Sequence, residues 1–317
     1  GGYAGLDAIR FGGGMGNVAR KPTVDFLPNV KSINDGRQTD AGAPRDSTGY
    51  SWKISGRPRY LEGARYFLQY AGMPDSLVYS PNFNKNDYND DYQSRGYWVN
   101  YLASSATDEK GNSSAKGLGL PVDLAFAFHT DAGTTLNDSI IGTLGIYFTN
   151  VDNGVYVNGA SRDLARDMTD LIQTSITNDI RTLYDPEWTR RGMWNQSYYE
   201  ARVPKVPTML LELLSHQNFA DMRYGLDPRF RFTVSRAVYK GMLKFIASQR
   251  KIEYVVQPLP VNHMSLKFNG DNEVKLNWQP VIDPLEPTAA AEKYIVYTRI
   301  GNGGFDNGTL VEKNNFK

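Results

Sequence analysis

A single carboxylate inside an apolar strand constrains this chain more than any other feature. The run from Val206 to Leu214 has the length of a strand, follows Pro204 and is almost entirely apolar, but it contains Glu212. A buried parallel strand is normally continuous in aliphatic residues, and an ionised side chain within it is costly unless a cation, a partner or solvent compensates. Because open α/β sheets place ligands at the carboxyl ends of their strands, we predict that Glu212 faces a functional site.

The sequence after Glu212 predicts a turn and then a helix. A polar turn spans Ser215 to Asn218, and the next short segment ends at Asp227-Pro228. From there apolar residues recur every three or four positions, as in an amphipathic helix packed on a sheet. The residues of this stripe are Phe232, Val234, Ala237, Val238, Gly241, Met242, Phe245 and Ile246. A strand, a functional turn and a helix in this order predict an α/β fold.

A second strand predicted to be buried, Leu118 to His129, also ends in a polar side chain. His129 is followed closely by Asp131, and after a loop comes another apolar strand, Ile140 to Phe148. A single histidine at a strand end is more often structural than functional, so residue type alone leaves both interpretations open. The helix predicted over Ala160 to Leu183 carries a stripe of Met and Ile, which we interpret as core.

The segment Thr189 to Arg202 combines arginines with aromatic residues. We predict a loop and a short strand near the site, where Arg191 and Arg202 pair with a carboxylate or with an acetyl or phosphoryl oxygen of a substrate. Simple packing of these side chains explains the same residues equally well.

The N-terminal part is less regular. Residues 3–19 begin as an alternating strand and end in glycines, without the Gly-Lys-Ser/Thr that completes a phosphate-binding loop. Residues 20–55 have the Pro, Asp, Gly and Ser content of a connector. Helices are predicted from Pro58 to Ala71 and from Arg95 to Leu102, with a short strand at Val78 and Tyr79 and a polar loop at 82–92 between them.

After Val256 the periodicity changes from helical to alternating. Pro258 and Pro260 mark a linker, and the segment SLKFNGDNEVKLNWQPVIDP then alternates as the strands of an antiparallel sandwich do. Trp278 is the core candidate of this part, and KYIVYTRIG supplies a further strand.

Composition excludes several classes of function. Lys and Arg total 35 against 34 Asp and Glu, so a net charge of +1 gives no electrostatic case for a nucleic-acid partner. No apolar run reaches the length of a membrane span, so no transmembrane segment is predicted. The absence of cysteine excludes disulfides and thiol chemistry. The 20 tyrosines are typical either of ordinary loops and edge strands or of a surface that stacks on sugars.

A long, ordered stretch resembles a known family. The segments RGMWN and YYEARVPKVPTMLLELLSHQNFADMRYGLDPRFRFTVSRAVYKGML resemble the C-terminal half of zinc-dependent N-acetylmuramoyl-L-alanine amidases, which are cell-wall hydrolases. The closer resemblance is to a branch from Bacteroides-type bacteria labelled xanthan lyases, in which a golvesin-like β domain splits the amidase-like domain and a fibronectin type III module follows.

This resemblance implies a fold and three parts. The fold is α/β, a three-layer amidase-like domain with a mostly parallel twisted sheet flanked by helices. The end of a golvesin-like β insert is expected at 1–19, the amidase-like domain at 20–256, and a partial fibronectin type III-like β-sandwich at 257–317.

The resemblance also implies hydrolysis of the amide between muramic acid and a stem peptide. In the family, zinc held by two histidines and a carboxylate, with one position open to water, polarises the carbonyl and activates the water, while a glutamate transfers protons. His129 matches the second histidine ligand, Glu212 the general acid/base, and Asn218 the turn residue that supports the glutamate.

The candidate substrate-binding residues are Asp131, His216, Asn218, Arg191 and Arg202. The implied partner is peptidoglycan or another cell-surface glycan, and the implied location is extracytoplasmic, in the periplasm, at the cell surface or secreted.

The remaining zinc ligands are not evident from the sequence. The chain has three histidines, and none precedes His129. Glu62 is the one plausible acid at a predicted helix start, and His216 is an alternative ligand four residues after Glu212. His263, in the linker to the sandwich, has no predicted role.

Three functions therefore stay open. The first is a cell-wall amidase whose ligand set is completed by residues missing from this sequence. The second is a noncatalytic module that binds a glycan or peptidoglycan through a degenerate site. The third is a polysaccharide lyase of the xanthan type, for which Tyr198, Tyr199, Arg202 and His216 are candidate groups.

Overall fold

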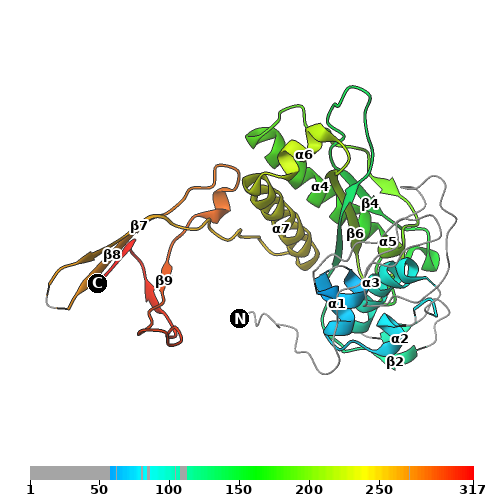
Figure 1. Cartoon of the computed structure of the whole chain (residues 1–317), viewed down its shortest axis with the longest axis horizontal. Helices are drawn as coiled ribbons and strands as arrows, with labels where there is room; N and C mark the ends of the chain where they lie inside the picture. The colour runs from blue at the N-terminus through cyan, green and yellow to red at the C-terminus, as the bar shows by residue number, and fades with distance from the viewer. Residues whose placement is uncertain are drawn as a thin grey trace, which may run out of the picture. The chain divides into compact units, whose positions relative to one another are not determined.

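The computed structural model describes residues 58–317 apart from 62, 80, 84–85, 104, 108–112 and 271. The golvesin-like segment expected at 1–19, the connector at 20–55 and Glu62 lie outside the described residues. Figure 1 shows the chain coloured by residue number, and two compact units are present. The first holds the described residues up to Gly133, with Thr143–Thr169 and Arg191–Ser215, and the second holds Thr134–Gly142, Asp170–Arg190 and His216–Lys317. The domain boundaries expected from the sequence stay predictions.

A four-stranded sheet forms the centre of the first unit, in the order β3-β6-β4-β5. Its strands are β3 (Ala125–Asp131), β6 (Thr208–Ser215), β4 (Leu144–Tyr147) and β5 (Trp194–Asn195). β3 runs parallel to β6 and β4 parallel to β5, but β4 is antiparallel to β6. The sheet is therefore mixed, with two strands in each direction, within a mixed α/β structure. The expectation of a mostly parallel sheet holds for the β3–β6 and β4–β5 pairs and fails between β6 and β4.

β6 has the burial pattern that its sequence predicts. Seven of its eight residues are buried, and the half-buried exception is Glu212. Leu210 of β6 packs with Leu144 and Ile146 of β4 in a cluster that Ala127 of β3 also contacts. The apolar residues of β6 are thus part of the core, and its one carboxylate, on Glu212, is half-buried.

In the described part of the first unit, four helical segments and a hairpin precede the sheet. They are η2 (Arg59–Leu61), α1 (Ala64–Tyr70), α2 (Asp75–Val78), α3 (Asp87–Ala103), and the hairpin of β1 (Ser105–Thr107) with β2 (Ser113–Lys116). η3 (Asp152–Gly154), the start of α4 (Asp163–Leu183) and α5 (Tyr199–Arg202) complete the unit. Leu68, Leu77 and Val78 form a second buried cluster, on which Trp98 and other aromatic side chains pack.

Two expectations in this region are wrong. Val78, expected in a strand, ends α2, and its carbonyl accepts hydrogen bonds from the side chains of Arg65 (2.7 Å) and Gln69 (2.9 Å). The polar loop expected at 82–92 is helical from Asp87, because the side chain of Asn86 accepts a hydrogen bond from the Asn89 N–H at 3.1 Å and so caps α3. The polar residues from Asp87 onward, predicted as a solvated loop, form the first turns of α3.

The second unit contains the rest of α4 together with α6 (Phe219–Gly225) and α7 (Pro228–Arg250). Asp227 caps α7, whose first residue is proline, as the Asp-Pro pair predicts. The predicted stripe of α7 is wrong at its beginning, since Phe232 is 53% exposed while Phe230 is buried. Phe230 contacts the rings of Trp188 and Tyr184, and this aromatic cluster decides which phenylalanine faces inward.

Gly241 allows α7 to approach α4 closely. A Cβ at this position would lie 2.6 Å from the Cα of Ile172. We expect Gly241→Ala to lower the free energy of unfolding by about 1–3 kcal/mol, since the clash is with backbone. Urea titration with Gly192→Ala as control measures the effect, because nothing lies within 4 Å of a Cβ at Gly192. Equal stability of the two variants would contradict the close helix contact.

The C-terminal part of the second unit is antiparallel. β7 (Asn262–Phe268), β8 (Val274–Gln279) and β11 (Asn315–Phe316) form one sheet, and β9 (Tyr294–Val296) pairs with β10 (Thr309–Val311). Figure 1 shows the long β7–β8 hairpin. Trp278 is buried and its ring lies 5.2 Å from that of Tyr294, so its predicted core position is confirmed. The fibronectin type III identity of this part stays a prediction.

In the described part of the chain no helix combines the length and the apolar character that crossing a membrane requires.

Candidate active site

The parallel pairing of β3 and β6 brings His129 and Glu212 together. The two residues are register partners across the pair, near the carboxyl ends of both strands. Two strand ends that the sequence singled out separately are therefore neighbours. The prediction of a strand from Leu118 to His129 is correct only from Ala125, and Ala125 is the one buried residue of β3. The metal role of His129 and the catalytic role of Glu212 stay predictions.

Glu212 is a half-buried carboxylate that lacks a full set of partners. Its Oε2 atom is buried and has no hydrogen-bond partner among the described residues. Burial raises the pKa of Glu212, and the nearby Asp131 raises it further, while His129 and Arg191 lower it by less. A carboxyl group whose pKa is raised in this way keeps its proton to a higher pH than an ordinary glutamate, as catalytic acids and bases often do.

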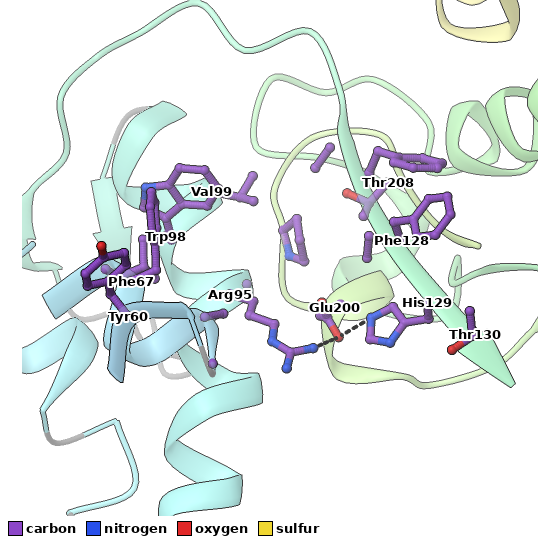
Figure 2. Close-up of a pocket in the computed structure, with 18 of the residues that line it drawn as sticks. Tyr60, Phe67, Arg95, Trp98, Val99, Phe128, His129, Thr130, Glu200 and Thr208 are labelled. Atoms are coloured by element: carbon purple, nitrogen blue, oxygen red, sulfur yellow. Dashed lines mark hydrogen bonds and ion pairs between the residues drawn. The ribbon is translucent and has the colours of Figure 1, made fainter. Parts of the chain in front are cut away.

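His129 and Arg95 converge on the carboxylate of Glu200, as Figure 2 shows. The Oε2 atom of Glu200 lies 2.9 Å from the Nε2 of His129 and 3.3 Å from an Nη of Arg95. Arg95 also contacts Asp91 at 2.5 Å, and Asp91 in turn accepts a hydrogen bond from the backbone N–H of Arg65 at 2.8 Å. The hydrogen bond to Glu200 is the main reason that the pKa of His129 is raised, since burial opposes it by less.

Glu200 and Arg95 were not among the residues singled out from the sequence. Glu200 lies in the first turn of α5 and Arg95 in the middle of α3. Glu200 is the one acid in the segment 189–202, where arginines and aromatic residues were predicted to lie near the site. A single acid among these arginines could have been identified as a candidate ion-pair partner. Nothing in the polar sequence of α3 distinguishes Arg95 from a solvated side chain.

Asp131 and Arg191 form an ion pair beside the strand ends. The Oδ2 of Asp131 lies 2.6 Å from an Nη of Arg191, whose guanidinium also stacks over Trp194 at 5.5 Å from the ring centroid. Burial raises the pKa of Asp131, but the hydrogen bonds from Arg191 and from the N–H of Ala132 outweigh it, and the net pKa is lowered. Asp131 is therefore a fixed anion at this edge of the sheet.

The other predicted substrate contacts are spread over both units. Arg202 ends α5 in the first unit, with its guanidinium 5.3 Å from the ring centroid of Tyr199. In the second unit His216 is exposed and follows β6 directly. Asn218 is buried, caps α6 by accepting from the N–H of Asp221 at 2.9 Å, and donates to the carbonyl of Ser139 at 3.0 Å.

The roles of these residues in binding a substrate or supporting Glu212 stay predictions. His263 is exposed in β7, and its Nδ1 lies 3.0 Å from the side-chain oxygen of Asn262.

The described residues do not supply a zinc site. Among them no group of three or more His, Cys, Asp or Glu side chains is placed to hold a metal ion. The Nε2 of His129 is directed at Glu200, and the guanidinium of Arg95 contacts the same carboxylate oxygen. A fixed cation on that oxygen disfavours a metal ion there by charge repulsion.

A pocket of about 920 Å³ lies in the first unit and reaches this cluster. Figure 2 shows Tyr60, Phe67 and Trp98 on one side of it and Phe128 and Thr208 on the other, with Arg95, Glu200 and His129 at one end. The pocket thus combines aromatic walls with one charged cluster, as small-ligand and peptide sites do.

Comparisons with known proteins give structural similarities alone. No family model matches the chain, and no curated protein matches its sequence. An N-acetylmuramoyl-L-alanine amidase of Nostoc punctiforme, AmiC2, is 17% identical over 39% of this chain and 58% of its own, with a TM-score of 0.30. The CwlD amidase of Clostridioides difficile, solved with the GerS lipoprotein, is 12% identical over 65% of this chain and 92% of its own, with a TM-score of 0.36. The chain spans less than two thirds of the length of the Nostoc enzyme. For this chain, the activity of that enzyme is therefore a proposal.

Proposed function

We propose that the protein belongs to the cell-wall hydrolases and cleaves the amide between muramic acid and a stem peptide, with Glu212 as the proton-transfer residue. The observation that carries this proposal is the half-buried carboxyl group of Glu212, beside His129 near the paired ends of β3 and β6. Its pKa is raised, and one buried oxygen has no hydrogen-bond partner among the residues that the structure describes. Peptidoglycan is then the partner, and the protein acts outside the cytoplasm.

The residues present supply two of the tasks that amide hydrolysis requires. Glu212 accepts a proton from the attacking water and returns it to the leaving amine. Arg95, which contacts Glu200 together with His129, is a cationic donor at the end of the pocket, where negative charge develops on a carbonyl oxygen. A zinc ion bound by His129 requires further ligands outside the described residues, and neither task depends on it.

A binding module without catalysis is the second candidate, and the aromatic wall of the pocket favours it. Tyr60, Phe67, Trp98 and Phe128 line a pocket that is large enough for a sugar or a short peptide. Aromatic rings of this kind stack on ligands without any chemistry.

Incubation of the chain with purified peptidoglycan separates these candidates. Amide hydrolysis releases soluble peptides with new alanine amino termini and leaves the glycan strands intact. Co-sedimentation with peptidoglycan without such release would support the binding module and overturn the amidase. New ultraviolet-absorbing unsaturated sugar ends from an acidic polysaccharide would support the lyase instead.

A further inference from the structure

The outer edge of β3 carries backbone groups that face away from the sheet. β3 is the outermost strand of the sheet in the part of the chain that the structure describes, with β6 on its other side. The N–H of Ala125 donates to the carbonyl of Pro207 at 2.9 Å, so Ala125 directs its backbone groups toward β6. Because successive residues of a strand alternate in this respect, the N–H and C=O of Phe126 and Phe128 point to the outer edge.

The 920 Å³ pocket runs along this edge. Six consecutive residues of β3, 125–130, line it, and residues of η2, α1 and α3 form the facing wall. Six strand residues span about 20 Å, so the pocket has the length of a short extended peptide. A sheet edge offers donors and acceptors at the repeat of a peptide backbone, which a sugar ring does not match.

The side chains around this edge suit the same ligand. Phe128 is 54% exposed and Phe67 is 47% exposed, and both line the pocket, so apolar surface is available for alternate side chains of a bound strand. At the carboxyl end of β3 the pocket ends in a charged cluster, in which Arg95 and His129 both contact Glu200 and Arg95 also contacts Asp91.

We propose that the peptide part of the substrate binds as an added strand along the outer edge of β3, recognised by the backbone groups of Phe126 and Phe128. This inference rests on the proposed function for the identity of the peptide. The added strand ends beside His129, whose register partner on β6 is Glu212.

Alternating methylation of the peptide backbone tests the strand pairing. The probes are a synthetic N-acetylmuramoyl tetrapeptide that begins with L-alanine and two analogues, N-methylated at the first and third or at the second and fourth amides. Calorimetry with the Glu212→Gln variant measures binding without turnover. Because alternate N–H groups of a strand face opposite sides, we expect one analogue to bind roughly tenfold more weakly and the other almost unchanged. Hydrogen exchange at the Phe126 and Phe128 amides should slow when the unmodified peptide is bound.

Equal affinity of the two analogues, or unchanged exchange at both amides, would overturn the added strand. Phe128→Ala removes the ring and keeps the backbone N–H, so the preference between the analogues should persist in this variant. Its disappearance would assign recognition to the ring and also overturn the proposal. Release of peptides from peptidoglycan without strand pairing would leave the proposed function standing and this inference refuted. Strand pairing without release of peptides would leave this inference standing and refute the proposed function.

Discussion

Glu212→Gln is expected to lower the rate of amide hydrolysis in peptidoglycan by about 10²–10⁴-fold, the range that a general acid/base contributes. Glutamine has nearly the same shape but neither accepts nor returns a proton. Release of alanine amino termini from peptidoglycan measures the rate. Glu253→Gln, an exposed change in the other unit, is the matched control and should keep full activity. Unchanged hydrolysis in the Glu212 variant would refute the assignment.

The same substitution is expected to stabilise the fold at neutral pH, which separates loss of catalysis from loss of structure. Burial raises the pKa of Glu212 above its ordinary value of 4.5, so the ionised carboxylate is less stable in the folded chain than in the unfolded one. The contribution of Glu212 to stability is therefore present below about pH 4.5 and is lost as the pH rises through its folded pKa. Urea titrations should show the variant gaining stability relative to the parent from pH 4 to pH 7, and a constant difference would contradict the raised pKa.

The largest expected effect on stability comes from a buried ion pair between two helices of the second unit. The Nζ of Lys240 on α7 lies 2.7 Å from the Oδ2 of Asp179 on α4, and the two side chains are only 3% and 10% exposed. Burial raises the pKa of Asp179 by more than Lys240 lowers it, so burying the ionised carboxylate carries a cost. Lys240→Met alone should lower the free energy of unfolding by about 3–5 kcal/mol, because it leaves a buried carboxylate without its partner.

The double variant Lys240→Met with Asp179→Leu tests this explanation. Removing both charges also removes the unpaired carboxylate, so the double variant should lose much less stability than the sum of the two single variants. Urea or thermal unfolding of all four proteins gives the coupling energy. Additive losses would show that the two side chains do not depend on each other and would contradict the buried pair.

Local patterns predicted the main elements of the fold. The interrupted aliphatic run identified β6 and its half-buried Glu212, and the Asp227-Pro228 pair identified the start of α7. The helix expected over 160–183 is found at Asp163–Leu183. These succeeded because periodicity, proline and capping residues act within a few positions of the chain.

Other expectations failed because distant contacts override local preference. Val78 has the β-branched side chain of a strand residue, but hydrogen bonds from the side chains of Arg65 and Gln69 hold its carbonyl at a helix end. Phe230 is buried in place of Phe232 because it meets an aromatic cluster that includes Trp188. The partners of the Val78 carbonyl lie 9 and 13 positions before it, beyond the few positions over which propensity and capping act.

By itself the sequence determined that the chain is α/β, that a carboxylate interrupts one buried strand and that a histidine lies near the end of another strand, since each of these is written in a short stretch of residues. Only the tertiary structure decided that β4 runs against β6, because the route of the chain between strands sets their direction. It also decided that Arg95 and Glu200, 105 positions apart, meet at His129. Such a cluster forms only when packing brings separate elements together, and that is why the charged end of the pocket could not be predicted from any local pattern.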